Sequence, residues 1–138
     1  MAARLITADS SVVVAALSGW HVSHAVSLEA LDDVERLPVH VLMESYSVLT
    51  RLPRGLAISA VEAAERLKAE FPGGALGLSV DDHVDLLGLL GRSRVIGGAV
   101  YDAVVGYSAQ RAGALLLTGD RRALRTYEAL GVDVELVG

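Results

Sequence analysis

The stretch Arg4–Leu17, RLITADSSVVVAAL, sets the interpretation of the whole chain. It begins with an apolar, β-prone run that ends at Asp9, and two serines then lead into a second apolar run. This pattern predicts a buried strand over 5–8 and a short helix over 12–17, capped by Asp9 or by one of the two serines. In an open parallel sheet, ligands bind just beyond the carboxyl ends of the strands, and Asp9 is expected at that edge.

Strand-like and helix-like segments alternate along the rest of the chain. Further strands are predicted over 39–42, 75–78, 114–117 and 132–137. Helices are predicted within 20–35, over 43–52, from a cap at Ser59 to about 70, from a cap at Ser79 to about 91, over 99–111 and over 121–130. The alternation indicates an α/β fold in which helices cover both faces of a parallel sheet, and a single domain over 1–138 is expected.

The composition excludes several classes of site. The chain has no cysteine, so disulfides, thiolate zinc sites and cysteine nucleophiles are ruled out. Its four histidines share no zinc-ligand spacing, and no Gly-rich phosphate loop or nucleophile elbow is present. No apolar run approaches the roughly 18 residues of a membrane span, so we expect a cytoplasmic protein without membrane contact. The net charge of −5 argues against general capture of nucleic acid but leaves open a nuclease whose acids bind metal.

Four carboxylates follow predicted strands or begin predicted helices. LITAD ends at Asp9, and ALLLTGD reaches Asp120. Glu44 and Asp102 are expected in the first turns of their helices. Taken alone, Asp9 and Asp120 are better explained as helix caps, and Glu44 and Asp102 are explained as charges that compensate a helix dipole. Together at one sheet edge they would repel one another, and a Mg²⁺ or Mn²⁺ ion would relieve that repulsion. Such an ion lowers the pKa of bound water and polarises a phosphoryl oxygen.

The ordered set of motifs resembles the PIN-domain family, and within it the VapC toxins of bacterial type II toxin–antitoxin pairs. The motifs are Asp-Ser-Ser at 9–11, Glu44, Tyr-Asp-Ala at 101–103 and Leu-Thr-Gly-Asp-Arg at 117–121. The resemblance implies a three-layer α/β/α fold with the strand order 3-2-1-4-5. It implies a Mg²⁺- or Mn²⁺-dependent endoribonuclease that blocks translation and growth. It also implies a homodimer and a cognate antitoxin whose tail occupies the acidic groove.

Carried over by position, the resemblance makes Asp9, Glu44, Asp102 and Asp120 the acidic cluster. Asp9 and Asp102 are the expected direct metal ligands. Glu44 either ligates the metal or orients the attacking water, and Asp120 acts through a water or completes a second metal site.

Polar and basic residues beside the acids complete the predicted site. Ser11 and Thr118 are the expected polar supports of the cluster. Arg121 and Arg122 are the nearest basic residues; they either contact substrate phosphates or are solvated residues at a helix start.

Other interpretations of the chain were weighed. Asp81, Asp82 and Asp85 with His83 resemble a metal cluster, but acids are expected at a helix start. A receiver-like domain needs a lysine near the last strands, and the one lysine is Lys68 in a mid-chain helix. A phosphatase with Asp-x-Asp is opposed by the serine at position 11. A PIN-like binding module with weak or absent catalysis stays open as the alternative function.

Overall fold

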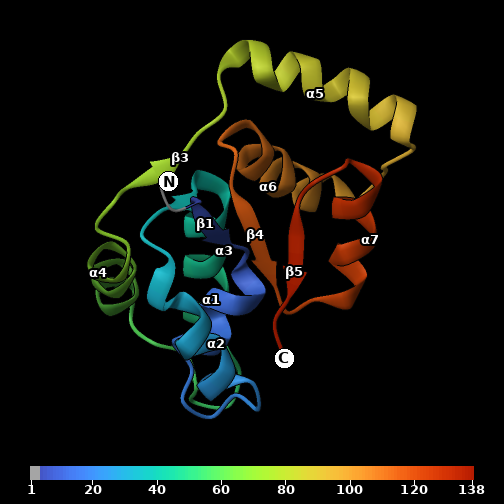
Figure 1. Ribbon diagram of the computed structural model, residues 1–138. Helices are drawn as coiled ribbons and strands as arrows, with labels where there is room; N and C mark the ends of the chain where they lie inside the picture. Colours follow the sequence, from blue (N-terminus) through green and yellow to red (C-terminus); the bar gives the residue numbers. More distant parts are fainter. Residues whose placement is uncertain (1–3) are drawn as a thin grey trace.

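Three parallel strands lie at the centre of the computed structural model, which describes residues 4–138 (Figure 1). They are β1 (Ile6–Ala8), β4 (Leu115–Thr118) and β5 (Val134–Leu136), in the spatial order β1-β4-β5. Three of the four residues of β4 are buried, as expected for a central strand covered on both faces. Because the strands are parallel, the carboxyl ends of β1 and β4 lie at the same edge of the sheet.

A second parallel pair, β2 (Leu37–Pro38) and β3 (Ala75–Leu76), continues the sheet beside β1. Between β1 and β2 the backbone ladder is interrupted, and the Thr7 hydroxyl donates a hydrogen bond to the Arg36 carbonyl at 2.9 Å. The predicted order 3-2-1-4-5 is thus met in part, as two hydrogen-bonded pieces. The strands near 75 and 134 are both shorter than predicted.

The predicted strand over 39–42 is wrong. These residues form the first turn of α3 (Val39–Thr50), and the strand lies just before them at β2. Pro38 is the residue before the helix and has extended backbone angles. The valines at 39 and 41 fit the two-residue period of a strand as well as the first turn of a helix. The helical period prevails because it buries Val41, Ser45 and Leu49 on one face. Glu44 therefore lies in the second turn of its helix rather than the first.

Helices surround the strands. They are α1 (Ser10–Ala16), α2 (His24–Ala30) with a 3₁₀ turn at Leu31–Asp33, α4 (Ala60–Glu70), α5 (Val80–Ser93), α6 (Ala99–Arg111) and α7 (Arg121–Ala129). Both predicted serine caps are confirmed. Ser59 Oγ accepts from the Glu62 amide at 3.2 Å, and Ser79 forms a reciprocal capping box with Asp82.

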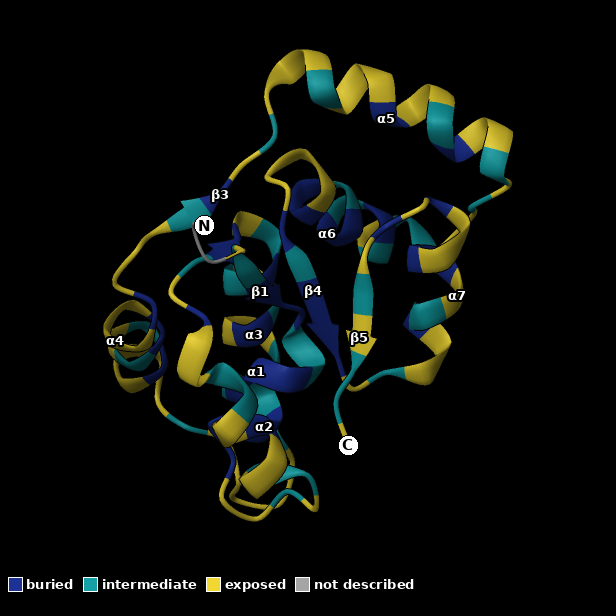
Figure 2. Ribbon diagram, viewed as in Figure 1, coloured by how far each residue is buried: buried dark blue, intermediate teal, exposed yellow. Residues whose placement is uncertain are grey.

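The helices form two groups on either side of the strands (Figure 1). The helix α1 packs against β1 and β4 together with α2 and α3, whereas α6 and α7 pack on each other and on β4. This arrangement confirms the predicted α/β fold with three layers. Figure 2 shows that β4 is buried while most of α5 is exposed. Within residues 4–138, no helix combines the length and apolar character needed to cross a membrane.

Candidate acidic site

Asp9 lies at the carboxyl end of β1, where it is also the N-cap of α1. Only 5% of the residue is exposed. Its Oδ1 accepts hydrogen bonds from the amide and hydroxyl of Ser11, and its Oδ2 accepts from the hydroxyls of Thr118 and Tyr127. These four donors fill the roughly four lone-pair positions of a carboxylate. Burial raises the pKa of Asp9 although the hydrogen bonds act against that shift.

The same hydroxyls tie the β1–α1 turn to the β4–α7 turn. Ser11 Oγ, which donates to Asp9, accepts from the Gly119 amide at 2.8 Å. Thr118 Oγ1 likewise donates to Asp9 and accepts from the Asp120 amide at 3.1 Å. The structure therefore brings both predicted polar supports into contact with Asp9, and through them it fixes the position of the second strand end.

Tyr127 on α7 is a partner of Asp9 that sequence analysis missed. Its ring is fully buried, and its hydroxyl donates to Asp9 Oδ2 at 2.8 Å. Burial and the charge of Asp9 raise the pKa of the phenol. Gly106 on α6 makes room for the ring, since a Cβ there would lie 2.9 Å from Tyr127 Cδ1. In the sequence, a tyrosine at the buried spacing of α7 is indistinguishable from an ordinary core aromatic.

Asp102 lies in the first turn of α6, which the chain enters through Gly97 in the left-handed region at φ 61°. The side chain is about half buried, and residues 4–138 supply no hydrogen-bond donor to it. Burial raises the pKa of Asp102 to about 6, and the charges of Asp120, Asp9 and Glu44 contribute in that order. The charges of Asp9, Glu44 and Asp120 therefore act on Asp102 closely enough to disfavour its ionised form.

Glu44 and Asp120 are the other two acids whose charges act on Asp102. Glu44 Oε1 accepts from the Ser10 hydroxyl, and its Oε2 lies 3.2 Å from His40 Nε2. Asp120 is the N-cap of α7, and its Oδ1 accepts from the amides of Arg122 and Ala123. Asp120 is therefore a helix cap, as Asp9 is. Its Oδ2 takes no part in the cap. Sequence analysis missed both Ser10 and His40.

Comparison with known proteins identifies the fold family. A family model described as PIN domain matches residues 6–129. The chain belongs to the PIN-domain family. It is 43% identical over 133 residues to Ribonuclease VapC40 of Mycobacterium tuberculosis in two strains, CDC 1551 / Oshkosh and ATCC 25618 / H37Rv; the match covers 96% of this chain and 99% of VapC40.

Two further relatives agree with that assignment. Ribonuclease VapC27 of Mycobacterium tuberculosis H37Rv is 40% identical over 130 residues, which is 94% of each chain. A chain in a structure of FitAB bound to an IR36 DNA fragment superposes with a TM-score of 0.69 at 18% identity, covering 96% of this chain and 94% of that chain. At that identity the likeness shows the shared PIN fold alone.

The acids of this PIN domain suit a hard divalent cation in their chemistry. Carboxylate oxygens are the ligands that Mg²⁺ and Mn²⁺ prefer, and the mutual repulsion that raises the Asp102 pKa is what a cation relieves. As placed, however, no three His, Asp or Glu side chains within 4–138 are gathered closely enough to chelate an ion. Asp9 has all its lone pairs engaged, so one hydroxyl must turn away before Asp9 ligates a metal.

Basic residues border the acids at the start of α7. Arg121 and Arg122 directly follow Asp120, and Arg122 Nε lies 3.9 Å from Asp120 Oδ1. The side chain of Arg122 is 97% exposed. With Arg125 they line a shallow hollow of about 540 Å³. Three arginines thus share one hollow at the start of α7, and guanidinium groups suit an anion there.

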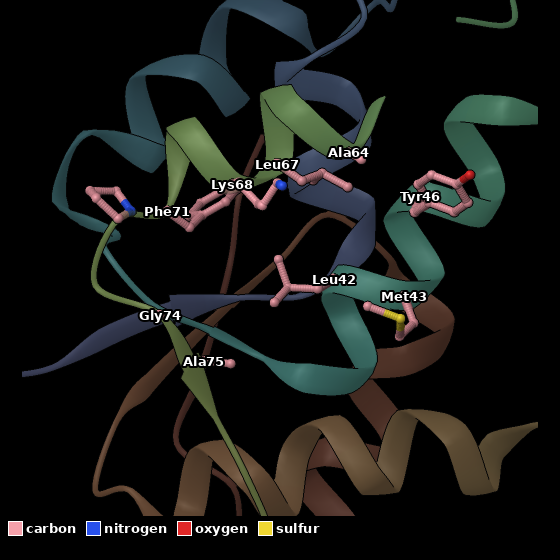
Figure 3. Close-up of a pocket in the computed structure, with 10 residues that line it drawn as sticks. Leu42, Met43, Tyr46, Ala64, Leu67, Lys68, Phe71, Gly74 and Ala75 are labelled. Atoms are coloured by element: carbon pink, nitrogen blue, oxygen red, sulfur yellow. The ribbon is translucent and has the colours of Figure 1, made fainter. Parts of the chain in front are cut away.

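Two other features of the PIN domain lie apart from the acids. Asp82, in the cluster set aside above, caps α5 and forms an ion pair with Arg111 at 3.2 Å. A pocket of about 500 Å³ lies between α3 and α4 (Figure 3), where Leu42, Tyr46 and Leu67 are among its lining residues. It is lined by none of the four acids.

Proposed function

We propose that this PIN domain is a Mg²⁺- or Mn²⁺-dependent endoribonuclease and the toxin of a type II toxin–antitoxin pair. The observation that supports the proposal is that the charges of Asp9, Glu44 and Asp120 all act on Asp102 and, together with burial, raise its pKa. RNA is the proposed substrate because two relatives at 43% and 40% identity are named ribonucleases VapC.

Each acid has a role that follows from its surroundings. Asp102 has no hydrogen-bond donor within the described residues and is the most available metal ligand. Asp9 is the rigid ligand because Ser11, Thr118 and Tyr127 fix its orientation. A bound divalent cation supplies activation of water and polarisation of the phosphoryl group.

Glu44 and Asp120 complete the proposed site. Glu44 Oε2 pairs with His40 and is the atom we assign to orienting the attacking water. Asp120 keeps one oxygen outside the helix cap for a second ion or a water ligand. Arg121 and Arg122 are assigned to the substrate phosphates, where a guanidinium binds two oxygens at once.

The remaining features of the proposal are what the resemblance to the VapC toxins implies. We infer a cytoplasmic single-domain protein that blocks translation, forms a homodimer and is inhibited by a cognate antitoxin whose tail enters the acidic groove. The second candidate function is a PIN-like binding module with weak catalysis. One observation favours it: within 4–138 the acidic side chains do not form a ready chelate.

Metal-dependent cleavage of a panel of structured RNAs distinguishes the two functions. We expect the wild type to cut with Mg²⁺ or Mn²⁺ and to be inactive with EDTA. The variants Asp9→Asn and Asp102→Asn lose activity while circular dichroism shows an intact fold. Asp85→Asn, an exposed acid on α5, is the matched control and keeps full activity. Cleavage by Asp102→Asn equal to the wild type overturns the nuclease, and no cleavage by any protein favours the binding module.

The toxin assignment is tested in cells. Expression of the wild type without its neighbouring antitoxin gene is expected to arrest growth, and co-expression of that gene restores growth. Growth that continues at wild-type expression levels contradicts a toxin.

A further inference from the structure

His40 and Tyr101 form a stacked aromatic pair, and each lies close in the chain to one of the four acids. Their ring centroids are 5.6 Å apart, and the ring planes differ by 6°. His40 lies one helical turn before Glu44 on α3 and contacts its carboxylate. Tyr101 directly precedes Asp102 on α6. Each ring is therefore carried by a helix that also supplies one of the acids, and the pair bridges the two helices.

Tyr101 is placed unlike a core aromatic. The residue is 59% exposed although its ring stacks on that of His40. The chain contains one Trp, four Tyr and one Phe, so aromatic rings are scarce. An exposed, stacked ring offers a flat apolar surface to a ligand at little cost in side-chain entropy.

A cavity adjoins the pair on the side of His40. It has a volume of about 320 Å³, and its walls include Val39, His40 and Met43 from α3 and Val104 and Ser108 from α6. Small-molecule sites begin at about 300 Å³, so this space suits one small planar group rather than a longer segment. His40 belongs both to the cavity wall and to the stacked pair, so the cavity begins beside the pair, although Tyr101 itself does not line it.

We propose that His40 and Tyr101 form a stacking platform for one unpaired nucleobase next to the scissile phosphate. The proposal rests on the proposed function, since it places the base relative to the acids that would act on the adjoining phosphate. Unpaired RNA bases stack on aromatic side chains, whereas bases in a duplex are not accessible in this way. The platform therefore selects RNA loops and single strands as the substrate class.

Charge makes such a platform useful in this chain. The net charge is −5, so long-range attraction of a polyanion is weak. Stacking depends little on charge, and a stacked aromatic surface supplies affinity that the acids cannot supply by themselves. The basic residues at the start of α7 then position the backbone rather than the base.

A double-substitution experiment tests the platform. The probes are fluorescently labelled RNA hairpins in which each loop nucleotide is replaced in turn by an abasic one, and their binding is measured in EDTA. We expect one loop position at which loss of the base weakens binding to the wild type by about tenfold. Tyr101→Ala weakens binding of the intact hairpin by a similar factor and no longer responds to that position. Tyr101→Phe, which keeps the ring, stays within about twofold of the wild type.

Trp20→Ala is the matched control, because Trp20 is also exposed and also contacts a histidine, His21. It is expected to retain the full response to the abasic position. The platform is overturned if Tyr101→Ala binds the intact and the abasic hairpins as the wild type does. It is also overturned if the losses of binding caused by Tyr101→Ala and by the abasic nucleotide are additive, because two groups that stack on each other must lose the same interaction only once.

The binding readout separates the platform from the nuclease. A base response that depends on Tyr101, together with no cleavage in Mn²⁺, supports the platform and refutes the nuclease. Cleavage that is unaffected by Tyr101→Ala at every loop position refutes the platform alone. A wild type that neither binds nor cuts any hairpin refutes both.

Discussion

Asp102→Asn should stabilise the metal-free protein, which is an unusual outcome for a substitution in a half-buried site. The wild-type carboxylate is desolvated and faces the charges of Asp120, Asp9 and Glu44. An amide of nearly the same shape removes one charge from that group. Without metal, the variant is relieved of repulsion that the wild type must bear in the folded state.

The magnitude and its pH dependence follow from the pKa of Asp102. Its pKa rises from the ordinary value of 3.8 to about 6, so the folded state binds the proton more tightly than the unfolded state. The free energy of unfolding is therefore unaffected below the lower value, falls as pH rises between the two, and stays reduced above the upper one. Two pKa units correspond to about 3 kcal/mol, and solvent screening of a half-buried group reduces this to roughly 1–2 kcal/mol.

Urea unfolding in EDTA measures the effect. We expect Asp102→Asn to be more stable than the wild type by roughly 1–2 kcal/mol near pH 7.5, with the difference shrinking as pH falls toward about 4. Asp85→Asn, on the exposed surface of α5, should change stability by less than about 0.5 kcal/mol at either pH. A variant that is less stable than the wild type near neutral pH refutes the reasoning, because the four carboxylates then do not repel one another.

Three further predictions concern the surroundings of the acids. Tyr127→Phe removes the buried hydroxyl that donates to Asp9 and should lower the free energy of unfolding by about 2 kcal/mol; unchanged urea stability contradicts this contact. Gly106→Ala places a Cβ 2.9 Å from the Tyr127 ring and should cost about 1–3 kcal/mol in thermal unfolding. Gly91→Ala has open space and should instead stabilise α5 by roughly 0.5–1 kcal/mol, and equal effects of the two glycine substitutions refute the packing argument. Arg122→Ala should weaken RNA binding in EDTA and reduce the slope of log K against log salt concentration by about 1, the value for one phosphate contact. An unchanged slope shows that the side chain is only solvated.

The alternation of apolar runs and helix-spaced segments was sufficient to predict the sheet, its parallel character and the position of Asp9 at the end of the first strand. The strand at 39–42 failed because alternating valines fit a strand and one turn of helix equally well. The segment is helical because a helix buries Val41, Ser45 and Leu49 on one face. That burial depends on tertiary packing and cannot be deduced from the local sequence.

Ser11 and Thr118 were predicted as partners of the acids, whereas Tyr127 and Ser10 lay beyond sequence reasoning for a related reason. Tyr127 reaches Asp9 across 118 residues, and Ser10 reaches Glu44 across 34 residues. Neither pair has a local spacing that marks it. The positions of Asp9 and Asp120 were predictable because a parallel sheet collects strand ends at one edge, whatever the distance along the chain. The hydrogen bonds that saturate Asp9 appear only when the helices are packed.

Mn²⁺ binding measured by titration calorimetry tests the central claim most directly, because the claim is that four carboxylates share one divalent-metal site. The wild type should bind Mn²⁺, and each of Asp9→Asn, Glu44→Gln, Asp102→Asn and Asp120→Asn should weaken that binding, with Asp102→Asn among the strongest effects. Asp85→Asn should bind like the wild type. Binding that is unchanged in all four variants, or a wild type that binds no Mn²⁺, contradicts the account.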